Sequence, residues 1–240
     1  MTSEPRSRRQ KIGQLKDKLW SDRSSFDAHW REIGDYVSPR RLRFWSSDRN
    51  RGEKRNQNIV DGTATMAART LQSGLHAGLT SPARPWFKLT VPDPDLAEFK
   101  SVKAWLHTTT KRMQTVFSSS NLYNSLPIVY GDMGTFGTAA MAVVSDPQEL
   151  LRCFVYPIGS YGLGMDYRGR VTTFIREYEL SVRQVVEMFG VKPGYRAIDW
   201  SNLSARVKRA WDASQYEDPV TIVWAVLPNE EANPKRLEAK

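Results

Sequence analysis

The sequence has little of the chemistry that metal sites and cysteine-dependent enzymes need. It holds a single cysteine, Cys153, and three scattered histidines, His29, His76 and His107. One cysteine cannot form an intramolecular disulfide, and the Cys and His residues lack the spacing of a zinc site. Cys153 lies between apolar neighbours, which favours a buried thiol over a nucleophile. We therefore expect no bound metal and no cofactor.

Long hydrophobic runs are absent as well. No segment approaches the ~18 consecutive apolar residues of a membrane span, and no signal-peptide core follows the polar N-terminus. The glycines of residues 131–137 do not form a phosphate-binding loop, because no lysine follows them and they end a helical pattern. No nucleophile elbow is present. We expect neither a membrane protein nor an enzyme, and a protein kept in a reducing cytoplasm.

What the sequence does hold is a large hydrophobic content and an uneven positive charge. Of its 240 residues, 40% are hydrophobic and 8 are tryptophan, which indicates a folded chain. The net charge is +9, and residues 1–55 carry most of it, with 15 Lys and Arg against 8 Asp and Glu. Such a basic block is typical of contact with a polyanion or an acidic partner, and equally of a solvated face.

The hydrophobic periodicity predicts an α+β fold, with helices packed on a small, mostly antiparallel sheet. The predicted helices span residues 12–37, interrupted near 21–25, and 59–79, 96–118, 122–135, 182–189 and 203–211. The predicted strands span residues 86–91, 139–144, 150–158, 161–167, 171–179 and 219–227. We expect a disordered basic tail over residues 1–10, one α+β domain over 11–227 and a polar tail over 228–240.

The predicted helix of residues 59–79 is followed by a proline-containing turn at residues 81–85, and together they form the stretch around which we expect the fold to be organised. Pro82 and Pro85 stop the helix, because proline lacks an N–H and restricts the residue before it. Trp86 and Phe87 then begin the predicted strand, and we expect Trp86 to be largely buried against the preceding helix. The predicted helix of residues 122–135 ends at Phe136, because Gly137 can adopt a backbone conformation that terminates a helix.

The most basic stretch is residues 40–57. Phe44 and Trp45 lie among its cations, and arginine interleaved with aromatic residues is typical of a nucleic-acid contact. A plain solvated loop is a further interpretation. The candidate contact residues are Arg40, Arg41, Arg43, Arg49, Arg51, Lys54 and Arg55.

Three stretches resemble the portal (head-to-tail connecting) proteins of short-tailed bacteriophages. They read GLTSPARPWFKL, SSSNLYNSLPIVYGDMGTFGTAAM and YPIGSYGLGMDYRGRVTTFIREYELSVRQVVEMFG. The resemblance extends from about residue 15 to 226, and its most specific parts are SPARPWF and the FGTA turn at residues 136–139. Portal relatives are much longer than this chain, so the resemblance implies the N-terminal portion of such a protein. The stem, clip and crown of the family would lie beyond residue 240.

The resemblance implies a structural role. Portal subunits form a ring of about twelve copies at one capsid vertex, through which double-stranded DNA is packaged and ejected and to which the tail attaches. The implied partners are further copies of the chain, double-stranded DNA, the major capsid protein, a scaffold, the terminase motor and tail adaptor proteins. The implied location is the virion, with assembly in the host cytoplasm.

The resemblance also changes how the basic stretch is interpreted. Residues 11–227 would form the α+β wing of the portal, and the arginines would pair with carboxylates of a neighbouring subunit. The alternative function is a basic DNA-binding module with no ring-forming role.

Overall fold

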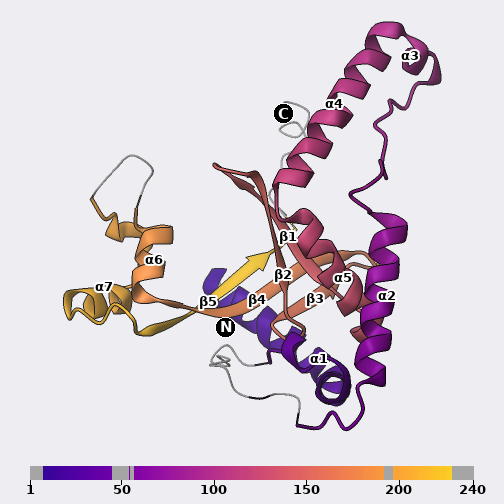
Figure 1. Cartoon of the computed structure of the whole chain (residues 1–240). Helices are drawn as coiled ribbons and strands as arrows, with labels where there is room; N and C mark the ends of the chain where they lie inside the picture. Colours follow the sequence, from indigo (N-terminus) through magenta and orange to yellow (C-terminus); the bar gives the residue numbers. More distant parts are fainter. Residues whose placement is uncertain (1–7, 45–53, 55–56, 192–196, 229–240) are drawn as a thin grey trace. The chain divides into compact units, whose positions relative to one another are not determined.

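The computed structural model describes residues 8–44, 54, 57–191 and 197–228 (Figure 1). These residues form helices and two small antiparallel sheets, which confirms the predicted α+β class. The strands make two separate sheets instead of one. The chain divides into two compact units, unit 1 (residues 1–27, 43–51 and 159–240) and unit 2 (residues 28–42 and 52–158).

Helix α1 (Arg8–Val37) contributes to both units and differs from its prediction in two ways. It begins inside the predicted tail of residues 1–10, and it continues through residues 21–25 without a break. Arg23 explains the second difference. Its guanidinium is buried, donates to the carbonyl oxygens of Gly159 at 2.8 Å and Tyr161 at 2.6 Å, and pairs with Asp27 one turn later at 2.9 Å. These bonds within unit 1 outweigh the weak helix propensity of the neighbouring serines.

In unit 2, helix α2 (Thr63–Leu79) lies side by side with α5 (Leu122–Phe136) (Figure 1). Two glycines on α5 permit the close approach. A Cβ atom at Gly131 would lie 2.9 Å from Oε1 of Gln72, and one at Gly134 would lie 2.7 Å from a methyl group of Leu71. Helix α2 begins at Thr63, four residues after the predicted start at residue 59. No residue of α2 is buried, so the outer face of this helix remains available for contact.

Helix α5 ends where the sequence predicts. Gly137 adopts a left-handed φ of 75° and donates its N–H to the carbonyl oxygen of Met133, which is a glycine C-cap. Phe136 is buried, and Trp30 Nε1 donates to its carbonyl oxygen at 3.2 Å. The chain can therefore turn at once from α5 into the next strand.

Strands β1 (Ala140–Asp146) and β2 (Leu150–Tyr156) form an antiparallel hairpin in unit 2. The side chain of Asn121 holds it to the helices, because it both donates to the Cys153 carbonyl at 2.8 Å and accepts from the Cys153 N–H at 2.7 Å. Cys153 itself is 3% exposed, and burial raises the pKa of its thiol. The predicted buried thiol is thus confirmed.

The segment after α2 is not the strand that the sequence predicts. Residues 86–91 pair with none of the described strands, and Leu89 instead donates its N–H to Thr110 Oγ1 of helix α4 (Lys100–Ser119) at 3.4 Å. Trp86 is 37% exposed, so the expectation that it is largely buried was also wrong. Its ring stacks on Phe117 and meets Phe87 edge-on, and its Nε1 donates to Tyr123 Oη at 3.0 Å. The aromatic and β-branched residues after the two prolines predicted a strand here. The prediction was wrong because none of the described strands lies beside this segment to pair with it.

Unit 1 holds the three-stranded sheet, ordered β3 (Tyr161–Met165), β4 (Val171–Ser181), β5 (Pro219–Val226). The first part of α1 packs closely on β3, where a Cβ atom at Gly162 would lie 2.9 Å from the Trp20 ring. The remaining elements are α6 (Val182–Phe189), η2 (Trp200–Asn202) and α7 (Ala205–Asp212). Their core consists of Val182, Val185, Val186 and Val207, and Ser181 with Gln184 forms the capping box that starts α6.

The Trp86 contacts predict a moderate contribution to stability. Trp86→Ala should lower the free energy of unfolding by about 1–3 kcal/mol, because it removes one hydrogen bond and two aromatic contacts. Trp105→Ala is the matched control, since Trp105 is 63% exposed on α4 and should change stability by less than about 0.5 kcal/mol. Urea unfolding of both variants measures the difference, and equal losses would contradict this role for Trp86.

The turn between β1 and β2 predicts an acid-dependent contribution. Asp146 accepts from the N–H groups of Glu149 and Gln148 and from Arg152 Nε at 2.7 Å, and these bonds lower the pKa of its carboxyl to about 2. The stabilisation is present above the ordinary value of 3.8 and is lost as the pH falls through about 2. Asp146→Asn should therefore be less stable than the wild type at neutral pH, with a gap that narrows below pH 4.

Urea midpoints measured from neutral pH to pH 2 test this expectation. The control is Asp95→Asn, in which an exposed carboxylate of the same unit is neutralised and little change is expected. A gap between wild type and Asp146→Asn that stays constant over this range would show that the Asp146 carboxylate is not the group that titrates.

Candidate functional site

The basic stretch leaves α1 through a short 3-10 helix, η1 (Pro39–Arg41). Arg40 is exposed on η1 and makes no hydrogen bond or ion pair with any residue that the structure describes, and the same is true of the exposed Lys54. Arg43 is half-buried and belongs to unit 1. The remaining candidates, Arg49, Arg51 and Arg55, lie outside the described residues.

Arg41 differs from Arg40 because its guanidinium forms an ion pair with a carboxylate of unit 2. Its Nε donates to Asp132 Oδ1 at 2.8 Å, and its Nη2 donates to Asp132 Oδ2, so the pair is bidentate. The backbone is fixed beside it, because the Arg41 carbonyl accepts from the Ile158 N–H at 3.0 Å. Arg41 therefore serves the fold and is a weaker candidate than Arg40 for contact with a partner.

The carboxylate that Arg41 meets is almost completely buried. Asp132 is 1% exposed on α5, and burial raises the pKa of its carboxyl, while the hydrogen bond and charge of Arg41 oppose that rise. A buried carboxylate is costly without a partner cation. The two residues therefore depend on each other across 91 positions of sequence.

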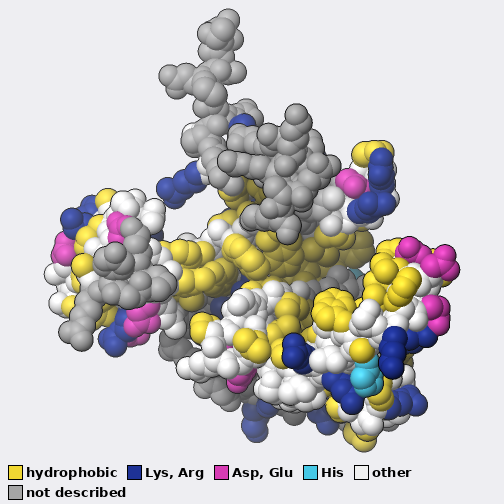
Figure 2. Space-filling view, turned by 90° about the horizontal axis from the view of Figure 1, so that it is seen from above, with side chains coloured by type: hydrophobic (Ala, Val, Ile, Leu, Met, Phe, Trp, Pro, Cys, Tyr) yellow, Lys and Arg dark blue, Asp and Glu magenta, His cyan; other side chains and the backbone are white. Residues whose placement is uncertain are grey.

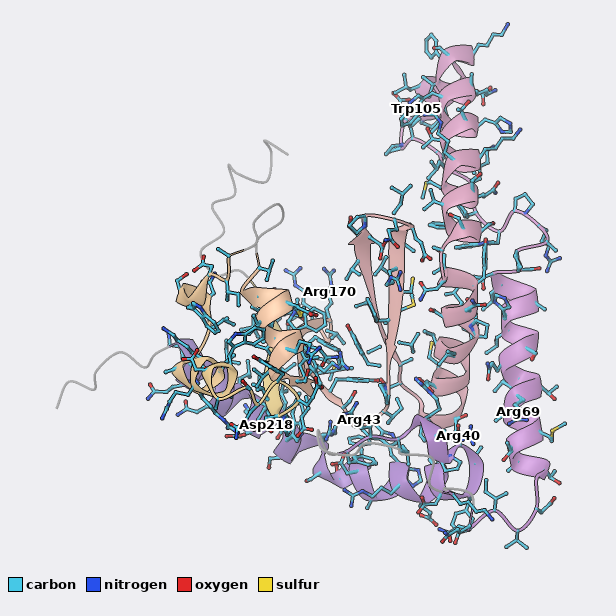
Figure 3. The ribbon with its side chains drawn as sticks, turned by 60° about the vertical axis from the view of Figure 1, so that its left-hand side comes forward. Arg40, Arg43, Arg69, Trp105, Arg170 and Asp218 are labelled. Atoms are coloured by element: carbon cyan, nitrogen blue, oxygen red, sulfur yellow. The ribbon has the colours of Figure 1, made fainter. Side chains whose placement is uncertain are left out.

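A groove with a volume of about 780 Å³ opens above this pair in unit 2. Its walls come from η1, α2 and α5. Four cationic side chains and one carboxylate line it, and the carboxylate is already paired: Arg40, Arg41, Lys54, Arg69 and Asp132. Figure 3 marks Arg69 on α2 and Arg40 on η1. Arg69 is exposed and, like Arg40, forms no hydrogen bond or ion pair with a described residue. We call this hollow the basic groove.

The basic groove also has apolar walls. Ile59, Met66 and Ile128 line it, and Met66 and Ile128 are 61% and 36% exposed. A concave surface that combines exposed apolar side chains with cations suits an occupant that carries both apolar groups and negative charge.

Exposed aromatic residues gather at another part of unit 2. Helix α3 (Pro94–Glu98) and the start of α4 expose Leu96, Phe99 and Trp105 to 44%, 61% and 63%. Seen from above, acidic side chains lie beside apolar ones at the right of the molecule, where this region faces the viewer (Figure 2). We call residues 93–105 the α3–α4 tip. Exposed Trp and Phe of this kind are typical of protein–protein contacts.

Within the described part of the chain, no three His, Cys, Asp or Glu side chains are grouped so that they could hold a metal ion. Among the same residues, no helix has both the length and the apolar character needed to cross a membrane. The surfaces that stand out are the basic groove and the α3–α4 tip, which are suited to binding.

A family comparison agrees with the motifs in the sequence. The family described as "Bacteriophage head to tail connecting protein" matches residues 9–240. The chain belongs to this family. It is 44% identical over 223 residues to the portal protein of Salmonella phage epsilon15, and 40% identical over 221 residues to the probable portal protein of Bordetella phage BPP-1. These matches cover 93% and 92% of the chain but 38% of each relative. The resemblance to phage portal proteins is thereby confirmed.

Two residues of this head-to-tail connecting protein were missed in the sequence. Asp132 lies in the glycine-rich segment of residues 131–137, whose pattern was compared only with that of a phosphate-binding loop. A carboxylate among the apolar residues of α5 is the signal that could have predicted a buried ion pair. Arg69 is the only arginine or lysine in α2, a helix rich in small residues. The sequence alone therefore does not show that Arg69 lies in the same groove as Arg40. Pro82 and Pro85 are exposed, and they follow the end of α2, whose C-cap is Thr80.

The Arg41–Asp132 pair predicts a large difference between adjacent arginines of this connecting protein. Arg41→Ala should lower the free energy of unfolding by about 3 kcal/mol, because it leaves the Asp132 carboxylate buried without a cation. Arg40→Ala, one position earlier and exposed, should change it by less than about 0.5 kcal/mol. Urea unfolding measures both. Replacing the pair together, by Arg41→Met with Asp132→Leu, should recover much of the loss, and equal effects of the two alanine variants would refute the assignment.

Proposed function

We propose that this chain is the wing portion of a phage portal protein, a structural subunit of the ring at one capsid vertex. The observation that carries the proposal is the match of almost the whole chain to two phage portal proteins. The chain corresponds to 38% of each relative, so the ring, the DNA conduit and the tail attachment are proposed for the protein as a whole. Residues 11–227 would form the α+β wing body.

The proposed protein works by assembly and not by catalysis. About twelve copies would close into a ring that conducts double-stranded DNA during packaging and ejection. Its proposed partners are the major capsid protein, the scaffold, the terminase motor and the tail adaptor proteins. It would be assembled in the host cytoplasm and retained in the virion. The exposed aromatic residues of the α3–α4 tip, and the groove cations Arg40, Lys54 and Arg69 that have no described partner, support a chain that contacts other proteins.

Within this proposal, the basic stretch contacts a neighbouring subunit. Arg40 and Lys54 are exposed and lie with Arg69 in a groove that has apolar walls. DNA phosphates would use the cations but leave the exposed Met66 and Ile128 without a partner. A portal must also let DNA slide, and tight static phosphate contacts would hinder sliding. These considerations favour the intersubunit role over the basic DNA-binding module.

The two roles predict different results for one variant. Arg40→Ala with Lys54→Ala should impair ring assembly, because it removes two groove cations, and it should leave the weak affinity of the chain for duplex DNA almost unchanged. Native mass spectrometry measures the assembly, and fluorescence anisotropy at several salt concentrations measures DNA binding.

A DNA-binding module would give the opposite pattern. The wild type would then bind duplex DNA with submicromolar affinity at physiological salt, and each lost phosphate contact would change the slope of log affinity against log salt by about 0.9. If the variant lost that binding and still assembled, the intersubunit role would be wrong.

A further inference from the structure

The basic groove contains cations that the described chain leaves unpaired. Arg40, Lys54 and Arg69 are exposed and form no hydrogen bond or ion pair with a described residue, while Arg41 is paired with Asp132. Three positive charges without a described partner, beside the exposed Met66 and Ile128, suit an occupant that carries both carboxylates and apolar side chains.

The α3–α4 tip presents that combination of groups. Its sequence, from Asp93 to Phe99, reads DPDLAEF. Asp93 is used as the N-cap of α3, where it accepts from the N–H groups of Asp95 and Leu96. The Asp95 carboxylate is exposed and has no described partner. Leu96, Phe99 and Trp105 add exposed apolar surface to the same tip.

Glu98 adds a second carboxylate to the tip. It is paired with Lys103 inside the tip, but both side chains are largely exposed, with 75% and 54% of their surface accessible. Lys103, and Lys88 nearby, lower the pKa of Glu98, so this carboxylate is ionised at neutral pH. An exposed pair of this kind contributes little to stability, and Glu98 can exchange Lys103 for an arginine that is better placed.

The two surfaces cannot satisfy each other within one copy. Arg40 and Arg69 lie at one end of unit 2, and Trp105 lies toward the opposite end of it, along α4 (Figure 3). Both surfaces belong to the same unit. Their separation therefore does not depend on the placement of unit 1.

We propose that the α3–α4 tip of one copy docks in the basic groove of a second copy of this chain. Asp95 and Glu98 would pair with Arg40 and Arg69, and Phe99 and Trp105 would cover Met66 and Ile128. Arginine beside these aromatic rings adds cation–π attraction. The inference rests on the proposed ring, since it names the two surfaces through which neighbouring subunits meet.

The proposed contact has the symmetry that a ring requires. The two surfaces are different, so the contact is heterologous, and each copy retains one free groove and one free tip. Repetition of the contact produces a closed ring when the rotation between neighbours closes. A contact between two identical surfaces would stop at a dimer.

Charge reversal tests the pairing in the full-length portal protein that contains this chain. Arg40→Glu with Arg69→Glu should raise the protein concentration needed for half-maximal assembly by about tenfold or more, since like charges would then face each other. Asp95→Lys with Glu98→Lys should have the same effect. All four substitutions in one chain should restore assembly, because the charges are complementary again. Arg112→Glu, an exposed reversal elsewhere on α4, is the matched control and should assemble as the wild type does.

A disulfide experiment tests the contact without requiring a complete ring. Chains that carry Arg69→Cys are mixed with chains that carry Glu98→Cys and are oxidised, with the native Cys153 buried in both. A disulfide-linked pair of chains should form in the mixture and not with Met188→Cys in place of Glu98→Cys. Met188 is 63% exposed on α6 of unit 1, outside the tip.

The outcomes separate this inference from the proposed function. If the wild type forms no ring, the proposed function fails, and the disulfide experiment still decides the contact. If the wild type forms rings, but charge reversal leaves assembly unchanged and no linked pair appears, the contact is wrong while the ring remains. Loss of duplex DNA binding in the groove variant alone, with assembly intact, would also overturn the contact and assign the groove to phosphates.

Discussion

The ion pair between Arg41 and the buried Asp132 carboxylate of α5 is the interaction on which the arrangement of η1 and α5 in unit 2 depends. The Asp132 side chain is 1% exposed, so without Arg41 it would lose its hydration and gain nothing in return. The bidentate contact fixes η1 against α5, and η1 in turn brings Arg40 to the edge of the basic groove. The groove and the site proposed for a neighbouring copy thus depend on one ion pair.

Adjacent arginines consequently have different roles. Arg41 is bound within the fold, whereas Arg40 remains exposed and unpaired among the described residues. A charge run in a sequence appears uniform, but the backbone of a short helix points successive side chains in different directions. The basic stretch therefore combines a structural contact with a surface that suits an acidic partner.

The chain leaves many apolar side chains exposed, and several of them belong to the two surfaces described above. Leu96, Phe99 and Trp105 form one surface at the α3–α4 tip, and Met66 and Ile128 form part of another in the basic groove. The residues that the structure describes in unit 2 leave both surfaces exposed. If the two surfaces are complementary as proposed, each copy could bind the next one repeatedly, as a connector ring requires.

The sequence by itself determined most helices, the approximate positions of the five strands, the helix end at Gly137 and the family, because periodicity, capping residues and motifs are local properties. It did not determine that these strands divide between two sheets. Nor did it determine that residues 86–91 pair with none of the described strands, that Arg23 keeps α1 continuous, or that Arg41 meets Asp132 while Arg69 joins Arg40. Each of these depends on residues that are distant along the chain, as the separation of 91 positions between Arg41 and Asp132 shows. Only the tertiary structure decided them, since hydrogen bonds and ion pairs require spatial proximity that a linear pattern does not encode.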